Sequence, residues 1–184
     1  MTRLALCLAL VTASPALARE VEGVNVPDTV SVEGTALELN GVGLRRATIF
    51  NVKVYVGALY VAKRSQDGAA IVEADAPKSV QMTFLRDVEK EKVLGGFKEG
   101  FEKNSAAQAK ELQPSLDRIA KVVPASMKPR QALLVTYAPG KGTTVTGPEG
   151  AVTVEGKAFA DALFRNWLGP DPADGGLKNA MLGK

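Results

Sequence analysis

The chain has 184 residues, a formal net charge of +3 and one cysteine, and it contains no histidine. Without histidine it lacks the commonest general base and metal ligand, and every catalytic arrangement that pairs histidine with serine or cysteine is excluded. Lysines are interleaved with glutamates rather than gathered in one basic segment, so we expect no nucleic-acid partner. We likewise expect no metal ion and no cofactor.

The N-terminus has the pattern of a secretory signal. Arg3 precedes an apolar stretch at residues 4–11, and the sequence Ala16-Leu17-Ala18 offers small residues at its exit. We therefore expect residues 1–18 to be removed and the mature chain to begin at Arg19, in the periplasm. A short buried helix is the alternative interpretation, and the stretch is too short for a permanent membrane span.

Residues 19–184 suit a single domain with a substantial core. Cys7 would be lost with the signal, so packing alone must stabilise this domain. Apolar residues alternate over roughly 20–86, recur at helical spacing over 88–123, and alternate again over 129–155 before a helical end. This order predicts an α+β domain.

The first half of the domain predicts two pairs of strands. Residues 29–32 and 36–39 flank Glu33-Gly34, a turn signal, and predict a short hairpin. Residues 41–50 and 52–63 are rich in β-forming residues and predict long central strands. Strict alternation divides the second long strand between one face with Val52, Val54, Val56, Ala58 and Tyr60 and another with Lys53, Tyr55, Gly57, Leu59 and Val61. Both faces are largely apolar, so we expect both to be covered.

Residues 88–123 predict two helices, with Asp87 placed to cap the first. The apolar stripe of the first helix consists of Val93 or Leu94, Phe97 and Phe101. Gly95, Gly96 and Gly100 are unfavourable inside a helix. They indicate either a close approach to the sheet or a wall that leaves room for a ligand.

The second half of the domain returns to strands. After a second helix that contains Pro114, residues 130–137, 142–146 and 151–154 predict a meander with glycine-rich turns. Residues 157–168 predict a final helix that stops at a Gly-Pro pair. The apolar side of this helix, which we expect to be core, consists of Phe159, Leu163, Phe164, Trp167 and Leu168.

Several motifs, in the same order along the chain, resemble the bacterial secreted branch of the chalcone isomerase-like family. They are a Gly-x-Gly-x-Arg turn at residues 41–45 that leads into a long strand, and the segments 84–88, 155–164 and 167–183. The resemblance covers about residues 33–183. It implies the family's fold, an antiparallel sheet backed by a layer of helices with an apolar cleft.

That family contains both isomerases and noncatalytic fatty-acid binders. The isomerases use an arginine after the Gly-x-Gly turn, a threonine on the next strand, and a tyrosine and an asparagine on the following helix. Arg45 matches the arginine, but Tyr55 stands at the threonine position, Val93 at the tyrosine position and Gly100 at the asparagine position. Without those polar groups a chalcone would lose the positioning that accelerates its ring closure, so we expect no chalcone cyclisation.

Arg45 and Tyr55 correspond to the pair with which the fatty-acid binders of the family hold a carboxylate. A guanidinium offers a forked, charged donor to a carboxylate, and a tyrosine hydroxyl adds another. Arg46 is the alternative, because consecutive strand residues point to opposite faces. We predict noncatalytic binding of a fatty acid or a similar apolar carboxylate. The alternatives are an isomerase or intramolecular lyase, with Arg45 stabilising an oxyanion, and a protein-interaction module with a vestigial cleft.

Overall fold

The computed structural model describes residues 18–47 and 50–184. The expected signal therefore lies outside the described residues, apart from Ala18, and its removal stays a prediction. Among the described residues, no helix is both long enough and apolar enough to cross a membrane.

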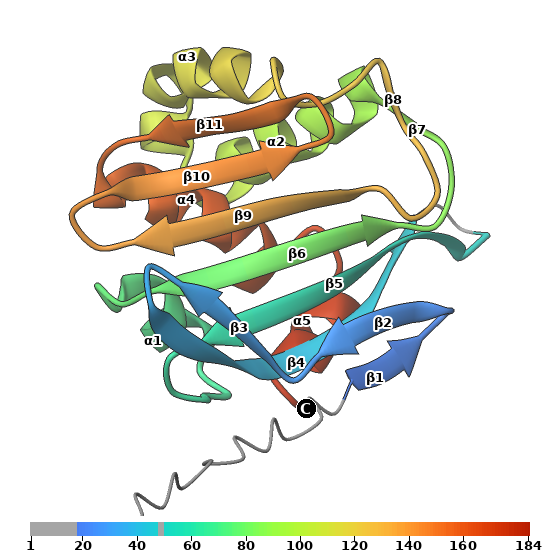
Figure 1. Ribbon diagram of the computed structural model, residues 1–184. Helices are drawn as coiled ribbons and strands as arrows, with labels where there is room; N and C mark the ends of the chain where they lie inside the picture. The colour runs from blue at the N-terminus through green and yellow to red at the C-terminus, as the bar shows by residue number, and fades with distance from the viewer. Residues whose placement is uncertain (1–17, 48–49) are drawn as a thin grey trace, which may run out of the picture.

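A seven-stranded antiparallel sheet forms the centre of the molecule, with the strand order β11-β10-β9-β6-β5-β4-β3 (Figure 1). Two further antiparallel ribbons pair β1 with β2 and β7 with β8. The strands of the large sheet are β3 (Thr29–Val32), β4 (Thr35–Ala47), β5 (Val52–Val61), β6 (Lys78–Phe84), β9 (Ala132–Ala138), β10 (Gly142–Gly147) and β11 (Gly150–Val154). The ribbons consist of β1 (Ala18–Val21), β2 (Val24–Pro27), β7 (Val88–Glu89) and β8 (Ser126–Met127).

Helices pack on one face of the sheet, and the β1–β2 ribbon lies on the other (Figure 1). The helices are α1 (Gly68–Glu73), α2 (Lys90–Asn104), α3 (Ala109–Ile119), α4 (Lys157–Leu168) and α5 (Gly175–Met181). On the helical side, the main core joins sheet residues such as Leu59 to Phe97 and Phe164 of the helices. A smaller core joins Tyr60 and its neighbours to Val26 of the ribbon. Both faces of β5 are covered, as predicted, and the α+β class is confirmed.

The Gly-x-Gly segment is not a turn, because β4 runs through it as one strand of 13 residues. The two glycines instead make room for α5. A Cβ at Gly41 would lie 2.1 Å from the carbonyl oxygen of Ala180, and one at Gly43 would lie 2.5 Å from the Ala180 side chain. Asn40 reinforces the contact, since its Nδ2 donates to the carbonyl oxygens of Met181, at 2.7 Å, and Ser65, at 2.9 Å. The prediction of a turn and a separate strand at 41–50 is therefore wrong.

A β-bulge in β5 also changes the predicted faces. The register between β4 and β5 skips Val54, so this residue is the extra one of the bulge. Strict alternation places Val52 and Val54 opposite Tyr55, but all three line the same cavity. Lys53 turns to the opposite side, where its Nζ lies 2.7 Å from the carboxylate of Glu22. The bulge thus adds two apolar side chains to the cavity wall.

The helices differ from the prediction in their ends. Helix α2 begins at Lys90 with Glu89 as its N-cap residue. Asp87 is not the cap, because its carboxylate pairs with Lys128 at 2.7 Å in front of the helix. Pro114 lies inside α3. Helices α1 and α5 and the β1–β2 ribbon were not predicted from the sequence.

Lys78 is buried, with 2% of its surface exposed, and stabilises the end of α1. Its Nζ donates to the carbonyl oxygens of Ile71 and Val72, both at 2.8 Å, and of Ala74, at 2.6 Å. Carbonyls in the last turn of a helix have no partner within the helix, so a side chain or water must satisfy them. Lys78 supplies that partner from β6 and ties α1 to the sheet.

We expect Lys78→Met to lower the free energy of unfolding by roughly 2–4 kcal/mol, because buried carbonyl groups lose their donor. Urea unfolding followed by circular dichroism measures this change. Lys121→Met is the control, since Lys121 is exposed and its replacement should change stability by less than about 0.5 kcal/mol. Equal losses in the two variants would contradict the role of Lys78.

Candidate functional site

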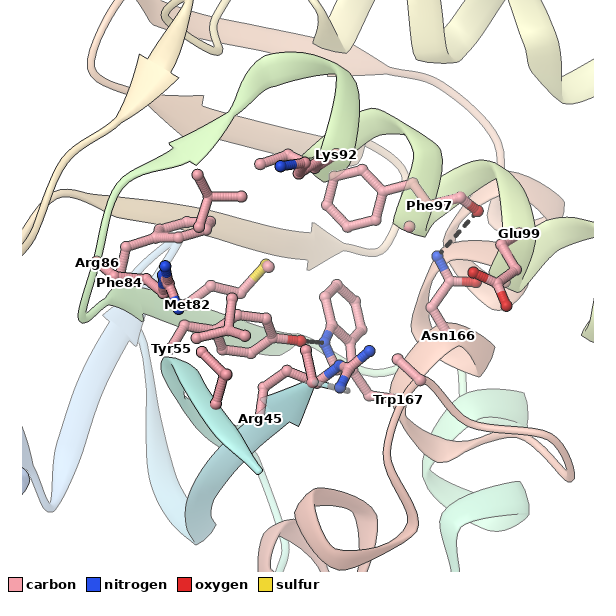
Figure 2. Close-up of a pocket in the computed structure, with 18 of the residues that line it drawn as sticks. Arg45, Tyr55, Met82, Phe84, Arg86, Lys92, Phe97, Glu99, Asn166 and Trp167 are labelled. Carbon is pink, nitrogen blue, oxygen red and sulfur yellow. Dashed lines mark hydrogen bonds between the residues drawn. The ribbon is translucent and has the colours of Figure 1, made fainter. Parts of the chain in front are cut away.

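A cavity of about 450 Å³ lies between the sheet and helix α2 (Figure 2). Its walls come from β4, β5, β6, α2, α4 and the segment that joins α4 to α5. The apolar part of the lining includes Val54, Met82, Phe84, Val93, Phe97 and Trp167. Charged residues also contribute, among them Arg45, Arg86, Lys92, Glu99 and Lys103. The volume and the mixed lining suit a small amphipathic ligand.

Tyr55 places a hydroxyl group inside this apolar wall. The side chain is 6% exposed, and its ring packs against Phe84 at a centroid distance of 5.7 Å. Trp167 Nε1 donates a hydrogen bond to the hydroxyl oxygen at 3.0 Å (Figure 2). Burial raises the pKa of Tyr55 to about 12, so the hydroxyl keeps its proton at neutral pH. Within the described part of the chain no group accepts that proton, and it remains available to a ligand.

Arg45 lies next to Tyr55 because the two residues are paired across β4 and β5. Its side chain lines the cavity and is 26% exposed. The guanidinium lies 3.8 Å from the carboxylate of Asp174 and also donates to the backbone carbonyl of Arg46. Arg46 is exposed and does not line the cavity. Of the two consecutive arginines, Arg45 is therefore the one that faces the cavity together with Tyr55.

Asp174 was missed by the sequence analysis, although it joins three parts of the site. Its Oδ1 accepts from the backbone N–H of Leu177 at 2.9 Å and caps α5. Its Oδ2 accepts from the backbone N–H of Arg46 at 2.9 Å and lies near the guanidinium of Arg45. An aspartate before Gly175-Gly176 is a helix-start signal that could have revealed the cap. Its proximity to β4 could not be read from the sequence.

At Gly100, the position that the sequence predicts to match the isomerase asparagine, a side chain approaches from another helix. A Cβ at Gly100 would lie 2.1 Å from Oδ1 of Asn166, so a side chain at that position would require the Asn166 side chain to move. Asn166, on α4, is 2% exposed, and its Nδ2 donates to the carbonyl oxygen of Phe97 at 3.4 Å (Figure 2). Gly100 thus permits a close approach, to α4 rather than to the sheet. The sequence analysis did not identify Asn166.

The other cavity-facing glycine has a different role. Gly96 lines the cavity, and a Cβ there would meet no atom within 4 Å. The missing side chain leaves open space in the cavity beside α2. This agrees with the interpretation that a glycine in α2 leaves room for a ligand. Val93, which the sequence predicts to match the isomerase tyrosine, also lines the cavity and offers only a branched aliphatic group. Within the described residues no group of histidine, cysteine and acidic side chains could hold a metal ion.

The sequence and the fold were compared with known proteins. The profile of the chalcone isomerase-like family matches residues 18–183. No curated protein matches the sequence. Among solved structures, the fold is similar to the crystal structure of the Arabidopsis thaliana fatty-acid binding protein AtFAP1, with a TM-score of 0.71 and 16% sequence identity over 91% of this chain and 96% of that one. Because the family profile extends over nearly the whole described chain, the protein belongs to the chalcone isomerase-like family.

Proposed function

We propose that the protein binds a fatty acid or a similar apolar carboxylate in the cavity and performs no chemistry on it. The observation that carries this proposal is the pair formed by Arg45 and Tyr55, a cation and a hydroxyl donor that lie side by side next to the apolar residues Val54, Phe84 and Trp167 of the cavity wall. AtFAP1, which has a similar fold, is described as a fatty-acid binding protein, and this supports the proposal.

The chemistry of the cavity matches the two parts of such a ligand. A carboxylate beside Arg45 would receive a charge-assisted hydrogen bond from the guanidinium, which is stronger than one between neutral groups. The Tyr55 hydroxyl would add a second donor. The hydrocarbon chain would lie against Met82, Phe84 and Phe97, where each buried methylene contributes about 0.8 kcal/mol.

Asp174 would share the guanidinium with the ligand. It holds Arg45 at the cavity wall, but as an anion it also lowers the attraction that Arg45 exerts on a second anion. In the empty site, Asp174 would pair with Arg45, so the arginine would not be an unpaired cation. In the occupied site, Arg45 would also bind the carboxylate of the ligand. This arrangement favours reversible binding.

Export to the periplasm is a further part of the proposal. It is supported by Arg3, the apolar residues 4–11 and the small-residue exit that ends at Ala18. The assignment to the bacterial secreted branch of the family has the same support.

We expect Arg45→Ala to weaken the binding of a long-chain fatty acid by roughly 1.5–3 kcal/mol, because a hydrogen bond to a charged group is lost. Tyr55→Phe should cost less, since it removes one neutral donor. Titration calorimetry measures both. Arg46→Ala is the matched control and should leave affinity unchanged. The corresponding fatty alcohol should bind more weakly than the acid and be nearly insensitive to Arg45→Ala. Equal affinities for acid and alcohol in both proteins would refute the site.

Asp174→Asn should tighten binding of the same fatty acid by roughly 0.3–1 kcal/mol, the usual value of a partly exposed ion pair. Asparagine caps a helix about as well as aspartate, so α5 should keep its start, although the amide nitrogen in place of Oδ2 no longer accepts from the backbone N–H of Arg46. Affinity for the fatty alcohol should not change. If the acid binds less tightly to this variant, Asp174 serves mainly to hold Arg45 in place, and the competition described above does not occur.

The purified protein should leave the spontaneous cyclisation rate of naringenin chalcone unchanged, because Val93 and Gly100 provide no polar group. Absorbance decay of the chalcone, with chiral chromatography of the product, measures this. A stereoselective acceleration of about a hundredfold, the low end for a positioned acid or base, would favour the isomerase alternative.

A further inference from the structure

The turn between β4 and β5 presents an aromatic side chain to solvent. Phe50 is 81% exposed and is the exposed large hydrophobic residue found within residues 18–47 and 50–184. The next residue, Asn51, has a φ of 53°, which closes the turn. Single exposed apolar residues are common on proteins. What lies around Phe50 therefore decides whether it has a role.

The cavity described above reaches the same end of the molecule. Ala47 and Val52, the residues at the ends of β4 and β5 next to the turn, both line it. Arg86 and Val88, which follow the end of β6, line it as well. The end of β6 lies beside the β4–β5 hairpin (Figure 1). Phe50 lies in the chain between Ala47 and Val52 and is therefore exposed close to one border of the cavity.

The charges at this end leave an excess of positive groups. Arg46 and Arg86 are exposed and form no ion pair within the described part of the chain. Among the acidic residues nearby, Asp174 lies beside Arg45, and three others are each paired with a lysine. These pairs are Glu22 with Lys53 at 2.7 Å, Asp87 with Lys128 at 2.7 Å and Glu89 with Lys92 at 3.3 Å. The hairpin end, defined by Arg46, Phe50 and Arg86, is therefore cationic with an aromatic tip.

We propose that the hairpin end docks on a lipid bilayer with anionic headgroups. Phe50 would enter the interface between headgroups and acyl chains, and Arg46 and Arg86 would contact the headgroups. The border of the cavity would then face the bilayer, so an apolar ligand could pass between bilayer and cavity with little exposure to water. This inference goes beyond ligand binding itself and does not depend on which ligand is bound.

A bilayer fits this surface better than a protein partner does. A protein interface needs an apolar centre of several residues surrounded by a polar rim. Among the described residues of the hairpin end, Phe50 is the one exposed large apolar side chain, and the apolar residues Ala47, Val52 and Val88 near it line the cavity. A lipid bilayer with anionic headgroups can deform around a single exposed aromatic side chain and needs no complementary pocket.

Vesicle flotation tests the proposal with ligand-free protein that begins at Arg19, since both core clusters lie within residues 19–184. Partitioning should be at least roughly fivefold stronger to vesicles that contain phosphatidylglycerol than to phosphatidylcholine alone. Arg86→Glu should reduce it by roughly fivefold or more, and Phe50→Ser by about tenfold. Lys121→Glu makes the same charge change at an exposed lysine outside the hairpin end and should have a smaller effect than Arg86→Glu.

Phe50→Trp provides a direct readout of insertion. The emission of the introduced tryptophan, taken as the difference from the wild type with its buried Trp167, should shift to shorter wavelength on anionic vesicles. Equal partitioning to both vesicle types, an equal loss with Lys121→Glu, or an unshifted emission would overturn the proposal. If the protein binds the vesicles but has no affinity for fatty acids, the docking proposal stands and the proposed ligand is refuted.

Discussion

One carboxylate, that of Asp174, holds together the parts of the molecule from which the cavity is made. It accepts the free backbone N–H of Leu177 at the start of α5 and the backbone N–H of Arg46 in β4, and it lies beside the guanidinium of Arg45. Helix α5, strand β4 and the cavity cation are thereby fixed with respect to one another. The carboxylate also partly balances the charge of a cation at the border of an apolar space.

The packing of helix α5 against strand β4 also explains the two glycines of that strand, Gly41 and Gly43. Helix α5 can reach β4 only because Gly41 and Gly43 have no side chains, and backbone and side-chain atoms of Ala180 occupy their space. The last helix of the chain thus packs against a strand near its beginning. This closure brings Asp174 to Arg45 across 129 residues of sequence, as the pairing of Arg45 with Asp174 shows.

The sequence predicted the class of the fold, the short hairpin at Glu33-Gly34, the meander of the C-terminal half and the family, because each rests on local periodicity, turn chemistry or a motif. It did not predict α1 and α5, which have six and seven residues, since helices this short depend on tertiary contacts more than on propensity. The bulge at Val54 was also missed, because strand alternation in the sequence carries no sign of a register shift.

For the site, motif matching selected Arg45 and Tyr55, and the structure places both on the cavity wall; their role in binding stays a prediction. Asp174 and Asn166 could not be selected in this way. Each acts on a residue far away in the sequence, and nothing in the local pattern of a helix start or of a helix interior reveals that partner. Trp167 was expected to be core, and it is, but its hydrogen bond to Tyr55 became apparent only from the fold.

The contact between Gly100 and Asn166 limits how a side chain could be introduced at the position predicted to match the isomerase asparagine. Asn166 brings an amide from α4 into the space that a side chain at position 100 would need. An asparagine introduced there alone would collide with the one already present. Either the buried Asn166 side chain moves aside, or the two positions change together, with the residue on α4 made smaller in the same step. Screens of single substitutions would pass over this route, whereas paired libraries at the two helices would contain it.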